Sequence, residues 1–209
     1  MQLLVVAATE FELSAARERL RGVAGVDFAT TGVGMLPTAY CLTRLLARKG
    51  YDWVFSVGIA GALADVALGE AVVVAREAVA DCGVETATGA VQPLPPALQS
   101  SVALTCPYVH DFPLLQHVKK VAGVTVNLLT ENATRVAARR AAAEVETMEG
   151  AAFFYVCLRE GVSFLQLRGI SNRVGVRDKQ LWRTAEALDS VGSLLTLALR
   201  GLQLTINHS

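Results

Sequence analysis

The sequence predicts an α/β fold with a mostly parallel central sheet. Apolar runs of strand length alternate along the chain with stretches whose apolar residues follow helical spacing. The first run, Leu3 to Ala8, is apolar at every position, which is typical of a strand buried on both faces. The 209 residues contain no internal repeat and no linker, so we expect residues 1–209 to form one domain.

A helix is expected directly after the first strand. Thr9 is a suitable N-cap, with Glu10 and Glu12 in the first turn. The apolar positions that face the core are Leu13, Ala16 and Leu20. In the simplest interpretation the two acids complement the helix dipole. They also follow the carboxyl end of a strand, where a parallel sheet places its ligands, so they are candidate active-site residues.

Three further strands are expected in the first half of the chain, at residues 28–31, 53–57 and 69–78. The turn Gly32-Val33-Gly34 leads into a helix over residues 37–49. A lone Gly-x-Gly before a helix is weak evidence for an anion site, because turn geometry explains it as well. The small residues from Gly58 to Leu63 either form a tight turn or let backbone approach a ligand closely.

The second half continues the alternation. Residues 82–97 are expected to form a loop with short strands, a candidate for a flexible wall over the site. Strands are predicted at 101–105, 124–130 and 163–170, a helix capped by Asn132 at 133–142, and a terminal helix at 180–202. The apolar positions of the terminal helix are Leu181, Leu188, Val191, Leu195 and Leu199.

The segment from Val145 to Phe153 is the centre of the predicted site. It begins like the end of a buried strand and continues as a helix of small and apolar residues that ends near Gly161. Glu149 lies in the first turn, where a carboxylate on a surface helix would simply complement the dipole. The residues after it, through Val156, are too apolar for a surface helix, so this carboxylate is expected to face a cleft.

Composition narrows the possible functions. Hydrophobic residues make up 53% of the chain, and such an apolar surplus is often covered in a subunit interface, so we expect a homo-oligomer. Lys and Arg together number 19, as do Asp and Glu, and this balance argues against a nucleic-acid partner.

The cysteines and the apolar segments bear on metals and membranes. Cys41, Cys82, Cys106 and Cys157 are scattered without metal-ligand spacing, so we expect no metal site, no disulfide framework and no cofactor. The start of the chain is typical of a first strand and not of a signal peptide, and the apolar stretch at 191–204 is interrupted by glycine, serine and arginine. We therefore expect a cytoplasmic protein without a membrane partner.

Three separated segments resemble the nucleoside phosphorylase and nucleosidase superfamily, in the order in which that superfamily carries them. Thr9-Glu10-Phe11-Glu12 is similar to the acidic entry loop of the methylthioadenosine and adenosylhomocysteine nucleosidases. Gly58 to Leu63 is similar to their Gly-x-Ala-Gly-x-Leu turn, and Glu146 to Ala152 to their ribose-binding segment. The resemblance covers nearly the whole chain and implies a three-layer α/β/α sandwich around a mixed, mostly parallel central sheet.

A fourth segment departs from those nucleosidases. They carry Ser-Asp where this chain has Ser171-Asn172, and their Asp contacts adenine. The run from here to Trp182, together with Thr147 to Gly150, resembles the futalosine hydrolases, which release hypoxanthine in an alternative menaquinone route. The NH₂ group of Asn172 suits a 6-oxopurine, because it can donate to both O6 and N7. Without the flanking resemblance, an Asx turn after a strand would explain Asn172 as well.

The resemblance implies hydrolysis of an N-glycosidic bond in a small-molecule nucleoside. Glu12 would take the proton of the attacking water, and Asn172 would stabilise the charge that gathers on the departing purine. Ile59, Met148 and Glu149 would contact the substrate, and Glu149 would accept hydrogen bonds from the ribose hydroxyls.

The benzoate-like acid of futalosine suggests a guanidinium partner. Arg173 and Arg177 are the candidates, with Trp182 as a stacking surface. Each also has a simpler interpretation, since Arg177 and Asp178 can order the start of the last helix and Trp182 can belong to the core.

Three other functions compete with this hypothesis. A purine nucleoside phosphorylase would need a phosphate cradle of Gly and Arg after the first strand, where this chain carries two acids. An adenine-releasing nucleosidase is disfavoured by Asn172. A nucleoside-binding protein with an inactive site is disfavoured because both Glu12 and Glu149 are present. The fold alone does not decide among them.

Overall fold

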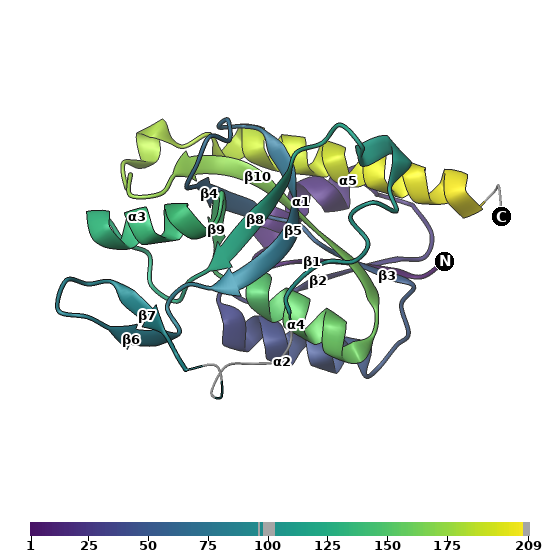
Figure 1. Ribbon diagram of the computed structural model, residues 1–209. Helices are drawn as coiled ribbons and strands as arrows, with labels where there is room; N and C mark the ends of the chain where they lie inside the picture. The colour runs from purple at the N-terminus through teal and green to yellow at the C-terminus, as the bar shows by residue number, and fades with distance from the viewer. Residues whose placement is uncertain (96, 98–102, 207–209) are drawn as a thin grey trace.

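The structure, a computed structural model, describes residues 1–95, 97 and 103–206 (Figure 1). The strands of its main sheet are β1 (Leu3–Ala7), β2 (Val26–Thr30), β3 (Trp53–Ser56), β4 (Ile59–Ala62), β5 (Ala71–Val79), β8 (Lys120–Thr125), β9 (Val145–Thr147) and β10 (Ser163–Arg173). They lie in the order β2-β1-β3-β10-β4-β9-β8-β5. The β4–β9 and β5–β10 pairs are antiparallel and the other pairs are parallel, so the sheet is mixed and mostly parallel. Because β10 also pairs with β5, one end of the sheet curls back on itself.

Helices cover both faces of this sheet. The five α-helices of the described chain are α1 (Glu10–Arg19), α2 (Met35–Leu46), α3 (Ala133–Ala142), α4 (Gly150–Glu160) and α5 (Thr184–Ile206). α1 and α5 pack together on one side, and α2 and α4 pack together on the other (Figure 1). The predicted three-layer α/β/α sandwich is therefore confirmed.

The core explains why α4 is apolar almost all round. α4 lies between α2 and the sheet, and seven of its residues are buried. Phe153 and Phe154 pack edge-on against Phe164 of β10, with ring centroids 5.6 and 4.9 Å apart. Gly161 ends the helix in the left-handed conformation, at a φ of 66°. This packing fixes the start of α4, which carries Glu149.

Two predicted elements have the wrong limits for identifiable reasons. The strand expected at 124–130 is β8, which begins at Lys120 and ends at Thr125. Lys120 can start a buried strand because its ammonium donates to three carbonyls of the preceding turn. The terminal helix begins at Thr184, after a short 3₁₀ helix at Lys179–Leu181. Leu181 is therefore not a core residue, and it is 60% exposed.

Two other segments differ from the prediction. Gly58 to Leu63 is not a tight turn, because residues 59–62 form β4 in the middle of the sheet. Of the strand predicted at 101–105, Ser101 and Val102 lie outside the described residues, and Thr105 makes only an isolated bridge to Arg76. The loop at 82–97 contains the expected short strands, β6 (Gly83–Glu85) and β7 (Val91–Pro93), which pair with each other.

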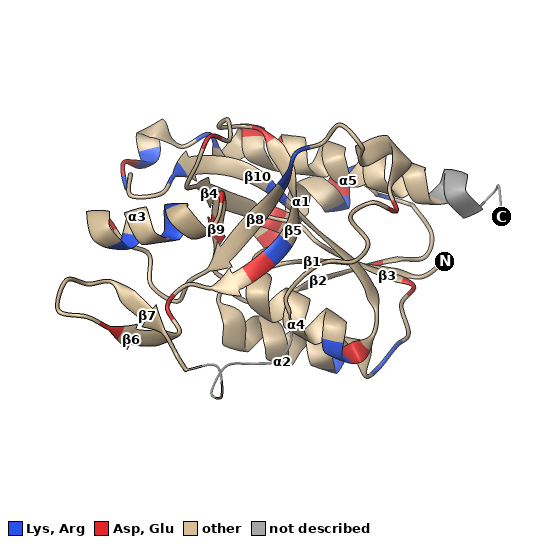
Figure 2. Cartoon of the chain, in the orientation of Figure 1, with Lys and Arg blue, Asp and Glu red and all other residues tan. Residues whose placement is uncertain are grey.

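The distribution of charged and apolar residues bears on the predicted absence of nucleic-acid, membrane and metal partners. Figure 2 shows charged residues of both signs spread over the sheet and the helices, which agrees with the balanced composition. Within the part of the chain that the structure describes, no helix has the length and apolarity needed to cross a membrane. Among the same residues, no group of three or more His, Cys, Asp or Glu side chains is placed so that it could bind a metal ion.

Candidate active site

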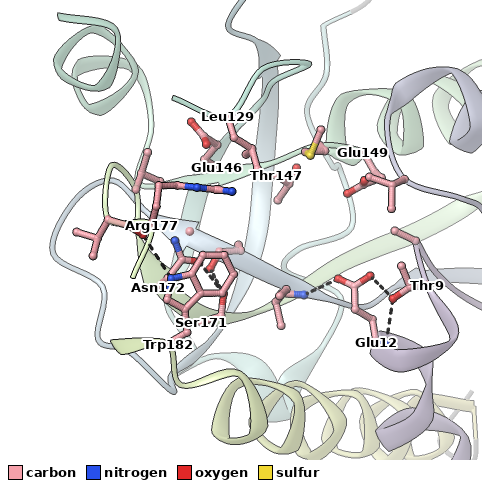
Figure 3. A pocket seen from close by; sticks show the side chains of 18 of the residues that line it. Thr9, Glu12, Leu129, Glu146, Thr147, Glu149, Ser171, Asn172, Arg177 and Trp182 are labelled. Carbon is pink, nitrogen blue, oxygen red and sulfur yellow. Dashed lines mark hydrogen bonds between the residues drawn. The ribbon is translucent and has the colours of Figure 1, made fainter. Parts of the chain in front are cut away.

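A cavity of about 340 Å³ opens where β1, β9 and β10 end, and side chains from distant parts of the sequence line it (Figure 3). The predicted site residues that line it are Glu12, Ile59, Met148, Glu149, Asn172, Arg177 and Trp182. None of the described residues of the 82–97 loop does so. The prediction that this loop forms a wall over the site is therefore wrong for those residues.

Glu12 is held in place by hydrogen bonds to both of its oxygens. Thr9 caps α1 as predicted, and its hydroxyl donates to Oε2 of Glu12 across 3.0 Å. The backbone N–H of Ile59 donates to Oε1, also across 3.0 Å. A Cβ at Gly58 would lie 2.6 Å from Oε1, so glycine is needed for this close approach. The small residues at 58–61 thus bring the Glu12 carboxylate close to the backbone.

Glu149 is the N-cap residue of α4 and is held by the turn that precedes α2. Its Oε1 accepts a hydrogen bond from the backbone N–H of Gly34 at 2.8 Å. Gly34 has a φ of 97°, which favours glycine. The anion that the Gly32-Val33-Gly34 turn binds is therefore Glu149 itself. Burial raises the pKa of Glu149, while the Gly34 N–H and the charge of Arg168 act in the opposite direction.

Arg168 on β10 is a further functional candidate, which the sequence analysis missed. It is only 3% exposed, and its guanidinium donates to Ser56 Oγ and to a backbone carbonyl. Burial lowers the pKa of Arg168, whereas the charges of Glu12 and Glu149 raise it. The positive charge of buried Arg168 offsets part of the repulsion between the two acids. The sequence feature that could have identified Arg168 is an arginine within an otherwise apolar strand.

A second buried acid supports the start of α4. Glu77 on β5 accepts hydrogen bonds from Gln166 at 2.7 Å and from the Thr125 hydroxyl at 3.0 Å. That hydroxyl in turn accepts from the N–H of Ala151 at 2.7 Å. Burial raises the pKa of Glu77 to about 7. The carboxyl of Glu77 occupies the space that a Cβ at Gly150 would need, so only glycine fits directly after Glu149.

Asn172 lies within β10 and not in a turn. The strand runs on to Arg173, with an irregular register between Ile170 and Asn172 that turns the amide toward the cavity. Ser171 Oγ donates to Asn172 Oδ1 at 2.8 Å, and Asn172 Nδ2 donates to the carbonyl of Arg173 at 3.0 Å. The amide is therefore fixed with its NH₂ group half used, and one N–H is left for a ligand.

The two candidate arginines point in different directions. Arg173 donates to the carbonyl of Ala64 at 2.7 Å and does not line the cavity, so its predicted contact with substrate has no support in the structure. Arg177 and Trp182 do line it, beside Asn172 and at the end far from Glu12 (Figure 3). Trp182 is not a core residue, since it is half-buried at the cavity and its indole donates to Val176.

Comparison with known proteins places this geometry in a family. The sequence model of the phosphorylase superfamily matches residues 24–200. The futalosine hydrolase of Thermus thermophilus is 36% identical over 187 residues, which cover 82% of this chain and 80% of that protein. The chain belongs to the phosphorylase superfamily, among the futalosine hydrolases.

A second curated relative agrees in sequence, and two solved structures agree in fold. The futalosine hydrolase of Streptomyces coelicolor is 35% identical over 189 residues, with 81% of this chain and 78% of that protein covered. The native futalosine hydrolase of Helicobacter pylori superposes with a TM-score of 0.80 at 16% identity, over 96% of this chain and 97% of its own. A second structure is described as a 5′-methylthioadenosine/S-adenosylhomocysteine nucleosidase of Francisella philomiragia. It superposes with a TM-score of 0.78 at 17% identity, over 95% of this chain and 99% of its own. At such identities the two structures show the fold alone.

Proposed function

We propose that this protein hydrolyses the N-glycosidic bond of futalosine and releases hypoxanthine, as a step of menaquinone biosynthesis. The observation that carries the proposal is the division of one cavity into two ends, in a chain that is 36% identical to a futalosine hydrolase. Glu12 and Glu149 lie at one end, and Asn172 lies at the other (Figure 3). This arrangement suits a sugar between two acids and a purine beside an amide.

The acids divide the chemistry at the sugar between them. Glu12 takes a proton from the attacking water, an effect on the order of 10² to 10⁴-fold in rate. Glu149 accepts hydrogen bonds from the ribose hydroxyls, and its charge favours the cation that develops at C1′. Met148 lines the cavity next to Glu149 and packs against the sugar. The Thr9 and Ile59 hydrogen bonds keep Glu12 oriented without occupying all of its lone pairs.

Hydrolysis is favoured over phosphorolysis by the surroundings of the sugar end. The turn that could bind phosphate before α2 already donates its Gly34 N–H to Glu149. The carboxylates of Glu12 and Glu149 would repel a phosphate ion there. Among the described residues that line the cavity, the cation is Arg177, which lies at the other end. Water is therefore the nucleophile that this site accommodates.

We also propose that the protein is a homo-oligomer. Phe11 and Val33 line the cavity and are 61% and 54% exposed, and the nearby α2 residues Leu36 and Tyr40 are 84% and 72% exposed. Large apolar side chains grouped at a cavity mouth are typical of a covered interface. Sedimentation of the purified chain tests this, since a monomer at micromolar concentration would rule it out. A cytoplasmic location stays a prediction from the sequence.

Incubation of the purified protein with futalosine and with aminofutalosine tests the proposed function. We expect hypoxanthine from futalosine and much slower release of adenine from aminofutalosine. Preferential release of adenine would identify an adenine-specific nucleosidase. Tight binding of futalosine without release of any base would identify a nucleoside-binding protein.

Asn172→Asp is expected to narrow this preference. Aspartate keeps the hydrogen bond from Ser171, but it places acceptors against O6 and N7 of hypoxanthine and can accept from the 6-amino group of adenine. An unpaired buried polar group costs about 1–3 kcal/mol. The ratio of kcat/KM values for futalosine and aminofutalosine should therefore fall roughly 10- to 100-fold, at about 1.4 kcal/mol per decade. An unchanged ratio would mean that backbone groups or bound waters choose the base.

A further inference from the structure

Arg177 is a cation that the sugar chemistry leaves unused. It is the positively charged member of the set of described residues that line the cavity, and its exposed side chain makes no hydrogen bond or ion pair within the described chain. The acids of the lining are Glu12, Glu146 and Glu149. Glu146 is paired with Arg139 at 2.7 Å, and the other two interact with Arg168. The charge of Arg177 is therefore available to a ligand.

The place of Arg177 in the cavity limits what it can contact. In Figure 3 the Arg177 side chain lies at the same end of the cavity as Asn172 and Trp182, with Glu12 and Glu149 at the opposite end. If those acids hold the water and the ribose, the purine lies on the Asn172 side. The base is attached at C1′ of the ribose and the 5′ substituent at C4′, so the two extend into different parts of the cavity. A guanidinium at the Asn172 end thus meets the base and not the substrate's acid.

The hydrogen bonds of Asn172 show that the base needs a second donor. A 6-oxopurine presents two acceptors on one edge, O6 and N7. The Asn172 NH₂ group has two hydrogens, and one of them is used by the carbonyl of Arg173 at 3.0 Å. One base acceptor therefore remains unmatched by Asn172. A guanidinium offers up to five donors and no acceptor, so it fits an oxo group and opposes the 6-amino group of adenine.

The bond-breaking step creates a negative charge at the same edge. When C1′–N9 breaks, both electrons of that bond pass to the purine, where the charge spreads over N7 and O6. Water adds to C1′ and gives its proton to Glu12, and the released base takes a proton from solvent. An amide carries no net charge, and Asn172 has one N–H left for the base, so it can meet only one of the two acceptors over which this charge spreads. A cation placed at this edge of the base would stabilise the developing charge.

We propose that Arg177 is a catalytic residue that donates hydrogen bonds to the departing 6-oxopurine and balances its negative charge. The proposal rests on the proposed function, because it uses hypoxanthine as the leaving group. It assigns to Arg177 a role at the base in place of the expected role at the benzoate-like acid. It also makes Arg177 a second determinant of the preference for a 6-oxo over a 6-amino purine.

Arg177→Gln tests the proposal, with Arg173→Gln as the matched control. The control removes the same charge four residues away, from a side chain that faces Ala64 outside the cavity. We expect Arg177→Gln to lower kcat for futalosine roughly 10- to 100-fold, since loss of one donor to a developing anion has effects of this order or larger. Inhibition by free hypoxanthine, which has no acid group, should weaken about 10-fold, and Arg177→Lys should recover part of both losses. Arg173→Gln should change neither quantity.

Four results would overturn the proposal. A loss of futalosine turnover with unchanged hypoxanthine inhibition would show that Arg177 binds the acid of the substrate. Unchanged turnover, an equal loss in Arg173→Gln, or a wild-type enzyme that hypoxanthine does not inhibit would each contradict a role at the base. Failure of the proposed function has a separate signature, which is the absence of hypoxanthine release from futalosine by the wild-type protein.

Discussion

Glu12→Gln is expected to lower kcat for futalosine hydrolysis by roughly 10² to 10⁴-fold, because an amide cannot accept the proton of the attacking water. The fold should survive the change. The side-chain oxygen of glutamine can still accept from the Ile59 N–H, and the Thr9 hydroxyl can rotate to accept from the new NH₂ group. The measurement is hypoxanthine release at saturating futalosine, together with the melting temperature of each protein.

Glu10→Gln is the matched control for this experiment. Glu10 lies two residues earlier in the same helical turn, is exposed, pairs with Arg17 at 2.9 Å and does not line the cavity. An exposed pair of this kind contributes little to stability, so the control should retain wild-type turnover. If Glu12→Gln folded normally and turned over futalosine as fast as Glu10→Gln, Glu12 would not be the base.

Glu149→Gln should also reduce kcat by at least about 10²-fold, since the ribose hydroxyls and the cationic transition state depend on the same carboxylate. Glutamine can keep the hydrogen bond from Gly34, so the expected loss reflects the missing charge and not a misplaced helix. A futalosine analogue without the 2′-hydroxyl should be a poor substrate for the wild type. The losses from the analogue and from the variant should add only in part, because both weaken the hydrogen bond between the 2′-hydroxyl and Glu149, while only the variant also removes the charge.

The pH dependence gives an independent check on Glu149. Burial raises its pKa, and the site needs this carboxylate ionised. The rate should therefore fall, as the solution is acidified, at a higher pH than an ordinary glutamate would give. The Glu149→Gln variant should lack this contribution to the acid limb of the profile. Full additivity of the analogue and variant losses, with an unchanged acid limb, would remove Glu149 from the sugar site.

Local signals in the sequence located most elements, and tertiary context decided the rest. Thr9 and Asn132 cap α1 and α3 as predicted, because each side chain accepts from an N–H three residues ahead. β8 was misplaced since a charged Lys120 at a buried strand start is permitted only by carbonyls of the preceding turn. Residues 127 and 128 look like strand in the sequence but bend away because Asp81, far earlier in the chain, accepts their N–H groups.

The candidate site was likewise predicted in part from local sequence signals, and the rest depended on tertiary context. Residues at the ends of predicted strands, such as Glu12, Glu149 and Asn172, reach the cavity because strand order alone brings those ends together. The direction of a side chain beyond an irregular strand cannot be read from spacing, so Arg173 and Arg177 could not be separated. Arg168 was missed because an apolar strand pattern conceals a buried cation whose acidic partners are remote in the sequence.

In the mechanism proposed above, water activated by Glu12 displaces hypoxanthine from futalosine. The most direct test of this mechanism is turnover of futalosine in ¹⁸O-labelled water, with and without phosphate, followed by mass analysis of both products. We expect free hypoxanthine, one ¹⁸O atom in the sugar product and a rate that does not depend on phosphate. A sugar 1-phosphate, a requirement for phosphate, or a released base other than hypoxanthine would contradict it.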